Sequence, residues 1–167
     1  MSHKFSFRFF SIWCMLLAMT AMHAESVKTK TPVRPKGQTD MVGFAADPID
    51  TVRVAFIGLG MRGPGAVERF TKIPGTRIVA LCDVEKERVD STQAILTRAG
   101  LPEAAAYWGS TDSWKKLVDR DDIDLVYVVT DWVSHYPIAK RAMEKGKHVA
   151  VEVPAALSLD EIWDLIN

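Results

Sequence analysis

Three glycines in the first half of the chain have the spacing that suits a dinucleotide. Gly58, Gly60 and Gly63 lie in the stretch GLGMRG, which fits the pattern G-x-G-x-x-G. The first glycine permits a tight turn, the second lets the backbone approach a pyrophosphate, and the third lets a helix pack closely against a strand. The amino end of that helix then offers N–H groups and partial positive charge to phosphate oxygens.

An acidic residue follows at the distance that such a site requires. Asp83 ends the apolar stretch IVALCD, about 20 residues beyond Gly63, where a carboxylate reaches the ribose hydroxyls of adenosine. A negative charge there disfavours a 2′-phosphate, so we expect NAD in preference to NADP. The alternative is that Asp83 only caps the helix that follows it.

Two further segments follow apolar stretches and so belong to the same edge of the expected sheet. They are TDWVSH (residues 130–135) and EVP (residues 152–154). Ligands of an open parallel sheet bind beyond the carboxyl ends of its strands, so we expect both segments to border the site. Trp132 could pack against the nicotinamide side of the cofactor, and Glu152 could face the crevice or simply end a strand. His135 has two alternative roles: it could bond to the cofactor, or it could cap the next helix.

The elements that must position these residues alternate along the chain. Apolar runs typical of buried parallel strands predict strands over residues 52–58, 76–83, 104–110, 123–130 and 147–153. Amphipathic stretches predict helices over residues 65–73, 84–100, 111–120, 135–146 and 158–167. The last helix has Ser158 and Glu161 in a capping-box relation. This order predicts an α/β fold, a Rossmann-type doubly wound parallel sheet. A complete dinucleotide fold usually has six strands, so we expect the N-terminal portion of a longer two-domain enzyme.

The amino-terminal part of the chain does not fit this alternation. Residues 1–24 contain the basic residues Lys4 and Arg8, then an apolar run, and end at Ala24, which is typical of a secretory signal peptide. The apolar run is shorter than the roughly 20 residues that span a bilayer, although a membrane anchor and a buried helix are alternatives. We expect an exported, periplasmic protein without a stable membrane span after removal of the signal.

We expect residues 25–50 to form a linker and lead-in segment, and residues 51–167 to form the nucleotide-binding domain.

Composition narrows the classes of function that the chain can have. The chain carries 21 basic and 21 acidic side chains, and this balance argues against nucleic acid as a partner. His148 has no neighbours at metal-ligand spacing, so we expect no metal site. We expect three tryptophans to be packing residues: Trp108, Trp114 and Trp163.

Four stretches together resemble a known family: VRVAFIGLGMRG, IVALCDVEKER, DLVYVVT and AMEKGKHVAVEVP. They are similar to the N-terminal domain of the glucose-fructose oxidoreductase and inositol dehydrogenase superfamily, Gfo/Idh/MocA, over residues 52–167. Most members of that family carry a lysine in the motif EKP, where it acts at the substrate carbonyl or hydroxyl. Here Val153 replaces it, which argues against an ordinary sugar dehydrogenase.

Two longer stretches, MVGFAADPIDTVRVAFIGLGMRGPGAVERF and VEVPAALSLDEIWDLI, closely resemble glycoside hydrolase family 109. The resemblance implies an NAD-dependent α-N-acetylgalactosaminidase that holds NAD tightly. The implied cycle oxidises the sugar at C3, eliminates the aglycone, adds water and reduces C3 again. Such a cycle needs no pair of carboxylates around the glycosidic bond.

The same resemblance implies which residues contact the cofactor. Besides the glycine motif, they are Met61, Arg62, Asp83, Trp132, Val133, Ser134, His135, Glu152 and Val153. Catalytic residues are expected in a C-terminal substrate domain that this sequence does not contain. The expected partner is a small-molecule or glycan substrate. The sequence also allows a homo-oligomer. Two alternatives stand beside the glycosidase: an NAD-dependent sugar or cyclitol dehydrogenase, and a truncated nucleotide-binding module without catalysis.

Overall fold

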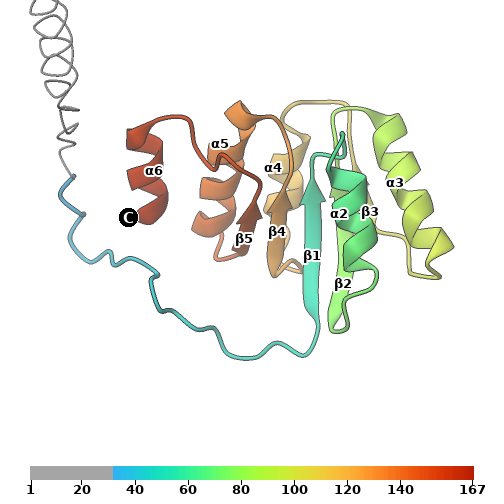
Figure 1. Ribbon diagram of the computed structural model, residues 1–167, viewed down its shortest axis with the longest axis horizontal. Coiled ribbons are helices and arrows are strands. Elements are labelled where there is room, and N and C mark those ends of the chain that lie inside the picture. The colour runs from blue at the N-terminus through green and yellow to red at the C-terminus, as the bar shows by residue number, and fades with distance from the viewer. Residues whose placement is uncertain (1–31) are drawn as a thin grey trace, which may run out of the picture. The chain divides into compact units, whose positions relative to one another are not determined.

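The computed structural model describes residues 32–167 (Figure 1). The expected signal peptide over residues 1–24 lies outside the described residues. Residues 32–51 contain turns and bends but no helix or strand, and the first strand begins at Val52.

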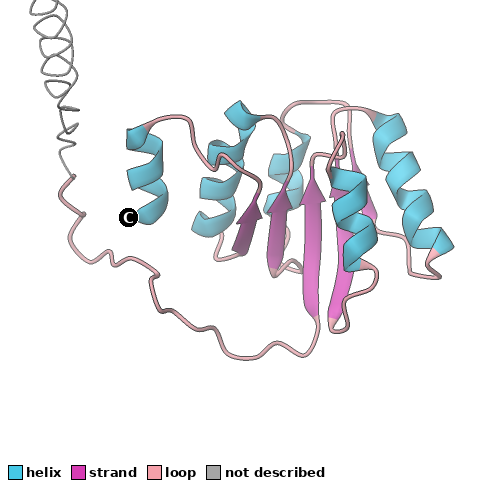
Figure 2. Ribbon diagram, in the orientation of Figure 1, coloured by secondary structure: helices cyan, strands magenta, loops and turns pink. Residues whose placement is uncertain are grey.

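Strands and helices alternate from Val52 onward (Figure 2). The strands are β1 (Val52–Ile57), β2 (Thr76–Cys82), β3 (Ala105–Tyr107), β4 (Leu125–Val128) and β5 (His148–Val151). The helices are α2 (Gly63–Phe70), α3 (Lys86–Arg98), α4 (Ser113–Val118), α5 (Trp132–Glu144) and α6 (Leu159–Ile166). Every expected strand and helix is present, with ends that differ by a few residues.

The strands form one parallel sheet in the order β3-β2-β1-β4-β5. The strand order reverses between β1 and β4, which is the point where an open α/β sheet binds its ligand. The arrows in Figure 2 all point the same way, so the carboxyl ends of the strands share one edge. This is the Rossmann-type doubly wound sheet that the sequence predicts.

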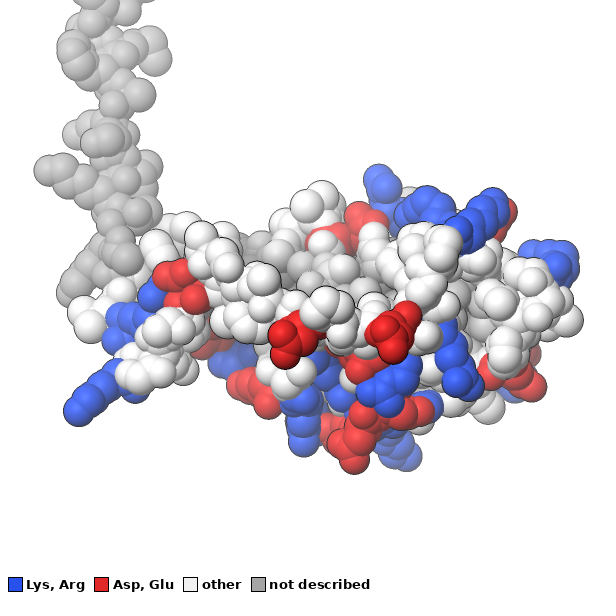
Figure 3. Space-filling view, turned by 90° about the horizontal axis from the view of Figure 1, so that it is seen from below, with Lys and Arg blue, Asp and Glu red and all other residues white. Residues whose placement is uncertain are grey.

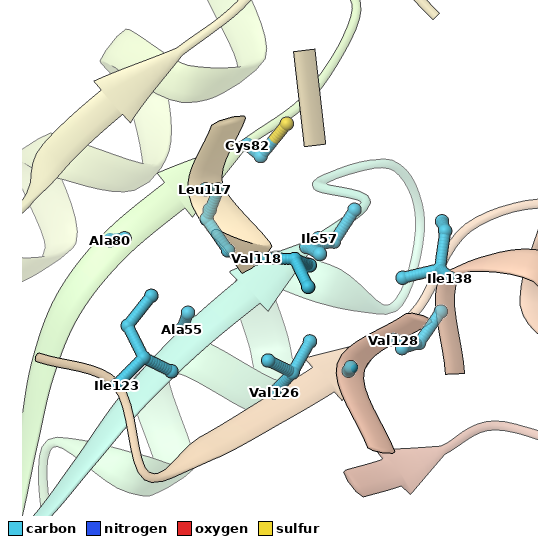
Figure 4. Packing of buried hydrophobic residues seen from close by; sticks show 11 residues of the cluster. Ala55, Ile57, Ala80, Cys82, Leu117, Val118, Ile123, Val126, Val128 and Ile138 are labelled. Atoms are coloured by element: carbon cyan, nitrogen blue, oxygen red, sulfur yellow. The ribbon is translucent and has the colours of Figure 1, made fainter. Parts of the chain in front are cut away.

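The core has two layers, one on each face of the sheet. In β1, Val54 and Phe56 pack with α2 and α3, whereas Ala55 and Ile57 pack with α4 and α5. Figure 4 shows the second layer, where Leu117 and other helix side chains meet those of the central strands. A near-continuous apolar run in β1 is therefore explained, because both of its faces are covered.

Helix α5 begins at Trp132, earlier than the expected start at residue 135. Asp131 is the reason, since its carboxylate accepts bonds from the backbone N–H of Ser134 at 3.1 Å and from its hydroxyl at 2.8 Å. Burial raises the pKa of Asp131, but the bonds from Ser134 outweigh it and leave the pKa below its ordinary value. The expectation that His135 could cap this helix is therefore wrong. The expected capping box of Ser158 and Glu161 is confirmed at α6.

An ion pair joins β1 to the start of β4 at the edge of the sheet where the strands begin, opposite their carboxyl ends. The backbone N–H and Nε of Arg53 donate to Asp124 Oδ2 at 2.8 and 2.9 Å, and Nη2 donates to Oδ1 at 2.6 Å. The guanidinium lowers the pKa of Asp124 to about 2, against the opposing effect of burial. Figure 3 views the molecule from this side and shows charges of both signs intermixed.

We expect Asp124→Asn to lower the free energy of unfolding at pH 7 by about 1–3 kcal/mol. The native pKa lies below the unfolded value of about 3.9, so this stabilisation is complete above that pH and is lost as the pH falls through about 2. Urea unfolding should therefore show a difference from the wild type that shrinks to about half by pH 3. Asp121→Asn, an exposed neighbour, is the control, and a penalty that does not change with pH would contradict the prediction.

Candidate functional site

A cavity of about 480 Å³ lies at the carboxyl ends of the strands. Its volume is within the range of about 300–1,000 Å³ that small-molecule sites occupy. Most of the expected site residues line it: Gly58, Gly60, Met61, Arg62, Asp83, Trp132, Ser134, Glu152 and Val153. The expected residues Gly63, Val133 and His135 are not part of this lining. The fold thus brings four segments that are distant in the sequence to one site: residues 58–62, 83, 132–134 and 152–153.

The glycine turn fits its expected role in detail. Gly58 has φ +95°, and a Cβ atom there would lie 2.5 Å from the backbone of Val129. A Cβ at Gly63 would lie 2.2 Å from the carbonyl oxygen of Gly58, so the start of α2 packs directly on the turn. A Cβ at Gly60 would meet nothing closer than Arg88 Nη1, at 3.9 Å. The open side of Gly60 therefore leaves room for a ligand to approach the backbone.

The backbone N–H groups of this turn are available to an anion. Within residues 32–167, the N–H groups of Gly60, Met61 and Arg62 donate to no protein acceptor, and α2 begins without a side-chain cap. Consecutive N–H groups at the amino end of a helix bind phosphate well. Arg62 adds a positive charge at the same wall of the cavity. These residues fit the pyrophosphate of a dinucleotide.

Asp83 is buried and connects β2 to the glycine turn. Its Oδ2 accepts from the backbone N–H of Leu59 at 2.7 Å, and its Oδ1 accepts from the N–H of Glu85 at 3.0 Å and from Arg88 Nη1 at 3.4 Å. A carboxylate has about four acceptor positions, so these bonds leave capacity for a further hydroxyl. The N-cap of α3 is Glu85 and no side chain caps this helix, so the alternative that Asp83 only caps it is wrong.

Cys82 also lines the cavity but is not a nucleophile. Burial raises the pKa of its thiol to about 12, and the charge of Asp83 adds to the effect. The thiol therefore stays protonated at neutral pH, whereas the thiolate is the reactive form.

The wall on the β4–β5 side combines exposed apolar side chains with a half-buried polar pair. Trp132 is 63% exposed and Val153 is 83% exposed. Glu152 Oε1 accepts from the hydroxyl of Tyr127 at 3.2 Å. Burial, followed by the charge of Glu152, raises the pKa of Tyr127, so its hydroxyl remains a donor. Glu152 thus faces the cavity while a strand side chain fixes its position.

His135 is only 1% exposed and lies beneath this wall. Its Nδ1 is 2.8 Å from the carbonyl oxygen of Pro154, and its Nε2 is 3.1 Å from that of Thr130. Both ring nitrogens therefore face backbone carbonyl oxygens and not the cavity. A bond from His135 to the cofactor stays a prediction without geometric support in this structure.

Thr130 and Asp131, from the expected segment TDWVSH, also line the cavity. Sequence reasoning missed several other residues that the fold adds to it: Val84, Arg88, Ser110, Thr111, Trp114 and Val129. Ser110 and Thr111 follow a strand, so the rule that ligands bind beyond strand ends would have found them. Trp114 packs against the core, as expected, and also borders the cavity.

Residues 32–167 hold no group of three or more His, Cys, Asp or Glu side chains placed to bind a metal ion. Among the helices of the same residues, none has the length and apolar character that a membrane crossing requires.

Comparison with known proteins agrees with the geometry. A family model for Gfo/Idh/MocA, described as "Oxidoreductase family, NAD-binding Rossmann fold", matches residues 52–167. The chain is 64% identical over 147 residues to "Glycosyl hydrolase family 109 protein 1" of Bacteroides fragilis (strain YCH46), covering 88% of this chain and 32% of the relative. It is 58% identical over 159 residues to a glycosyl hydrolase family 109 protein of Porphyromonas gingivalis, covering 91% and 34%. The chain spans about a third of the length of these relatives.

Solved structures share the fold with their cofactors bound. Myo-inositol dehydrogenase from Lactobacillus casei, in complex with NAD(H) and myo-inositol, is 26% identical with a TM-score of 0.59, covering 70% of this chain and 32% of that one. KijD10, a 3-ketoreductase from Actinomadura kijaniata in complex with NADP, is 27% identical with a TM-score of 0.55, covering 69% and 34%.

We expect Gly60→Ala to weaken NAD binding about tenfold or more, because the methyl group enters the space beside the pyrophosphate. The melting temperature should change little, since a Cβ there meets no backbone. Calorimetric titration with NAD measures the effect. Gly65→Ala is the matched control, because a Cβ at Gly65 also has space and that residue is outside the cavity lining. Equal effects of the two substitutions would show that the turn does not approach the ligand.

We expect Asp83→Asn to reduce the preference for NAD over NADP by roughly tenfold, since it removes a negative charge from the ribose site and frees Arg88. The measurement is the ratio of the dissociation constants for NADP and NAD. Weakening of the bonds to Leu59 and Glu85 affects both cofactors alike and cancels in this ratio. Asp90→Asn, on the exposed side of α3, is the control. An unchanged ratio would show that Asp83 does not face the ribose.

Proposed function

The chain belongs to the Gfo/Idh/MocA oxidoreductase family, whose NAD-binding Rossmann fold it carries, and on that premise we propose that it is the NAD-binding part of a glycosidase. The proposed reaction is the release of terminal α-N-acetylgalactosamine. It proceeds by oxidation at the sugar C3, elimination, addition of water and reduction.

Val153 is the observation that carries this proposal. It lines the cavity at the position where the family pattern EKP has a lysine, and its side chain is largely exposed. An aliphatic side chain cannot exchange a proton with a substrate hydroxyl, so this chain lacks the group that an ordinary sugar dehydrogenase of the family uses there. The relatives that are 64% and 58% identical carry the name glycosyl hydrolase family 109, which supports the same proposal.

In the proposed reaction, the residues of this chain bind the cofactor and orient it. The N–H groups of the glycine turn hold the pyrophosphate, and Asp83 accepts a bond from the adenosine ribose. Trp132 and Val153 cover the nicotinamide side with apolar surface, which excludes water. Bound NAD would supply a reversible hydride acceptor for the sugar, so the proposed cycle would cause no net oxidation.

The acid and base of the elimination are assigned to no residue of this chain. Cys82 is protonated, Asp83 is engaged by backbone N–H groups, and Glu152 accepts a bond from Tyr127. We propose that these groups come from the part of the relatives' length that this chain does not span.

A sugar or cyclitol dehydrogenase is the second candidate. The solved myo-inositol dehydrogenase, which shares the fold, is the observation in its favour. The two candidates differ in whether NADH accumulates as substrate is consumed.

The assay uses a protein that contains this chain and has the full length of its relatives. We expect it to cleave p-nitrophenyl α-N-acetylgalactosaminide without accumulating NADH. Removal of NAD should lower the rate at least about a hundredfold, because the cofactor supplies the oxidation that starts the cycle. Release of nitrophenol and absorbance of NADH are followed together, with myo-inositol plus NAD as the control substrate. NADH formed in proportion to a free sugar or cyclitol would support the dehydrogenase instead.

A further inference from the structure

His135 joins two segments that are far apart in the sequence. Thr130 lies between β4 and α5, and Pro154 follows β5. The imidazole fills the space between them, with Nδ1 2.8 Å from the carbonyl oxygen of Pro154 and Nε2 3.1 Å from that of Thr130. A neutral imidazole has one N–H and donates it to one of these two carbonyls, according to its tautomer. The ring therefore sets the distance between the two segments.

Each of these segments supplies one part of the cavity wall. Asp131, Trp132 and Ser134 line the cavity from the start of α5, and Glu152 and Val153 line it from the end of β5. The lining does not include His135, which is buried beneath it. A side chain that holds both parts of a wall from below can change the shape of the cavity without touching its contents.

Other bonds hold each segment to its own neighbour. Asp131 caps α5 through Ser134, and the backbone N–H of Glu152 donates to Val128 at 3.0 Å. Neither bond connects the start of α5 to the EVP segment, whereas the contacts of His135 do. Within residues 32–167, this ring is therefore the side chain that links the start of α5 to the EVP segment, beside the strand pairing of β4 with β5.

The position of the wall indicates which half of a dinucleotide it receives. The glycine turn and Asp83 lie at the ends of β1 and β2, and they suit the pyrophosphate and the adenosine ribose. The strand order reverses between β1 and β4, so a dinucleotide that crosses this point places its nicotinamide half at β4 and β5.

We propose that His135 is a positioning residue that sets the separation of residues 130–134 and 152–154, and through them the orientation of the nicotinamide half of NAD. It does so without contacting the cofactor. The proposal goes beyond the proposed function, because it holds for a glycosidase and for a dehydrogenase alike. A carbonyl that loses its donor relaxes toward other partners, and shifts of about 1 Å at a reacting group are costly.

The test compares two ligands that differ in the nicotinamide group. In His135→Phe, which fills the space without a donor, we expect the dissociation constant for NAD to rise about tenfold or more and that for ADP-ribose to change less than about twofold. His135→Gln keeps an amide donor and should recover part of the NAD affinity. His148→Gln, at an exposed histidine at the start of β5, is the control. Calorimetric titration of this chain gives all the constants.

A general structural role predicts a different pattern. Equal weakening of NAD and ADP-ribose in His135→Phe would overturn the proposal, as would unchanged affinity for NAD. Equal affinity of the wild type for the two ligands would also overturn it, because the wall would then contribute nothing to the nicotinamide half. If His135→Phe does not fold, His135→Gln carries the test, with NAD weakened about threefold and ADP-ribose unchanged. These readouts measure binding, so they do not depend on the reaction catalysed.

Discussion

The close approach of α2 to the end of β1 is the constraint on which the site depends. A side chain at Gly63 would collide with the carbonyl oxygen of Gly58, and one at Gly58 would collide with the backbone of Val129. Because nothing separates these backbones, the amino end of α2 points into the cavity at the centre of the sheet. The bond from Leu59 to Asp83 then fixes the turn to the end of β2, so the free N–H groups of the turn and the carboxylate of Asp83 are held side by side.

The parts of the site that the sequence predicts are those that follow the ends of strands. Period and length identify the strands, and the parallel order places Gly60, Asp83 and Glu152 at one edge. The parts that it does not predict depend on contacts between distant segments. His135 was expected to face the cofactor or cap a helix, and its partner Pro154 is visible only once β5 lies beside α5. Arg88 likewise reaches the cavity from a helix that the sequence predicts only as amphipathic, without indicating which of its charged side chains meets the turn.

Helix α5 starts at Trp132 and not at the expected residue 135, and the reason lies in the residues next to its start. Both Asp131 and His135 could start a helix, and the apolar pattern of the following residues does not distinguish them. Asp131 is the better cap, since its carboxylate accepts two bonds from Ser134. The choice matters for the site, because it turns Trp132 and Ser134 into the first helical turn and moves His135 into the interior.

Cys82 has a consequence for the chemical durability of the site. Its thiol borders the cavity, yet burial and the neighbouring carboxylate of Asp83 keep it protonated. Oxidation to a sulfenic acid and exchange with disulfides both begin from the thiolate, so both are slow at such a residue. The same apolar surroundings that complete the core layer below the cavity thus protect this thiol from oxidation.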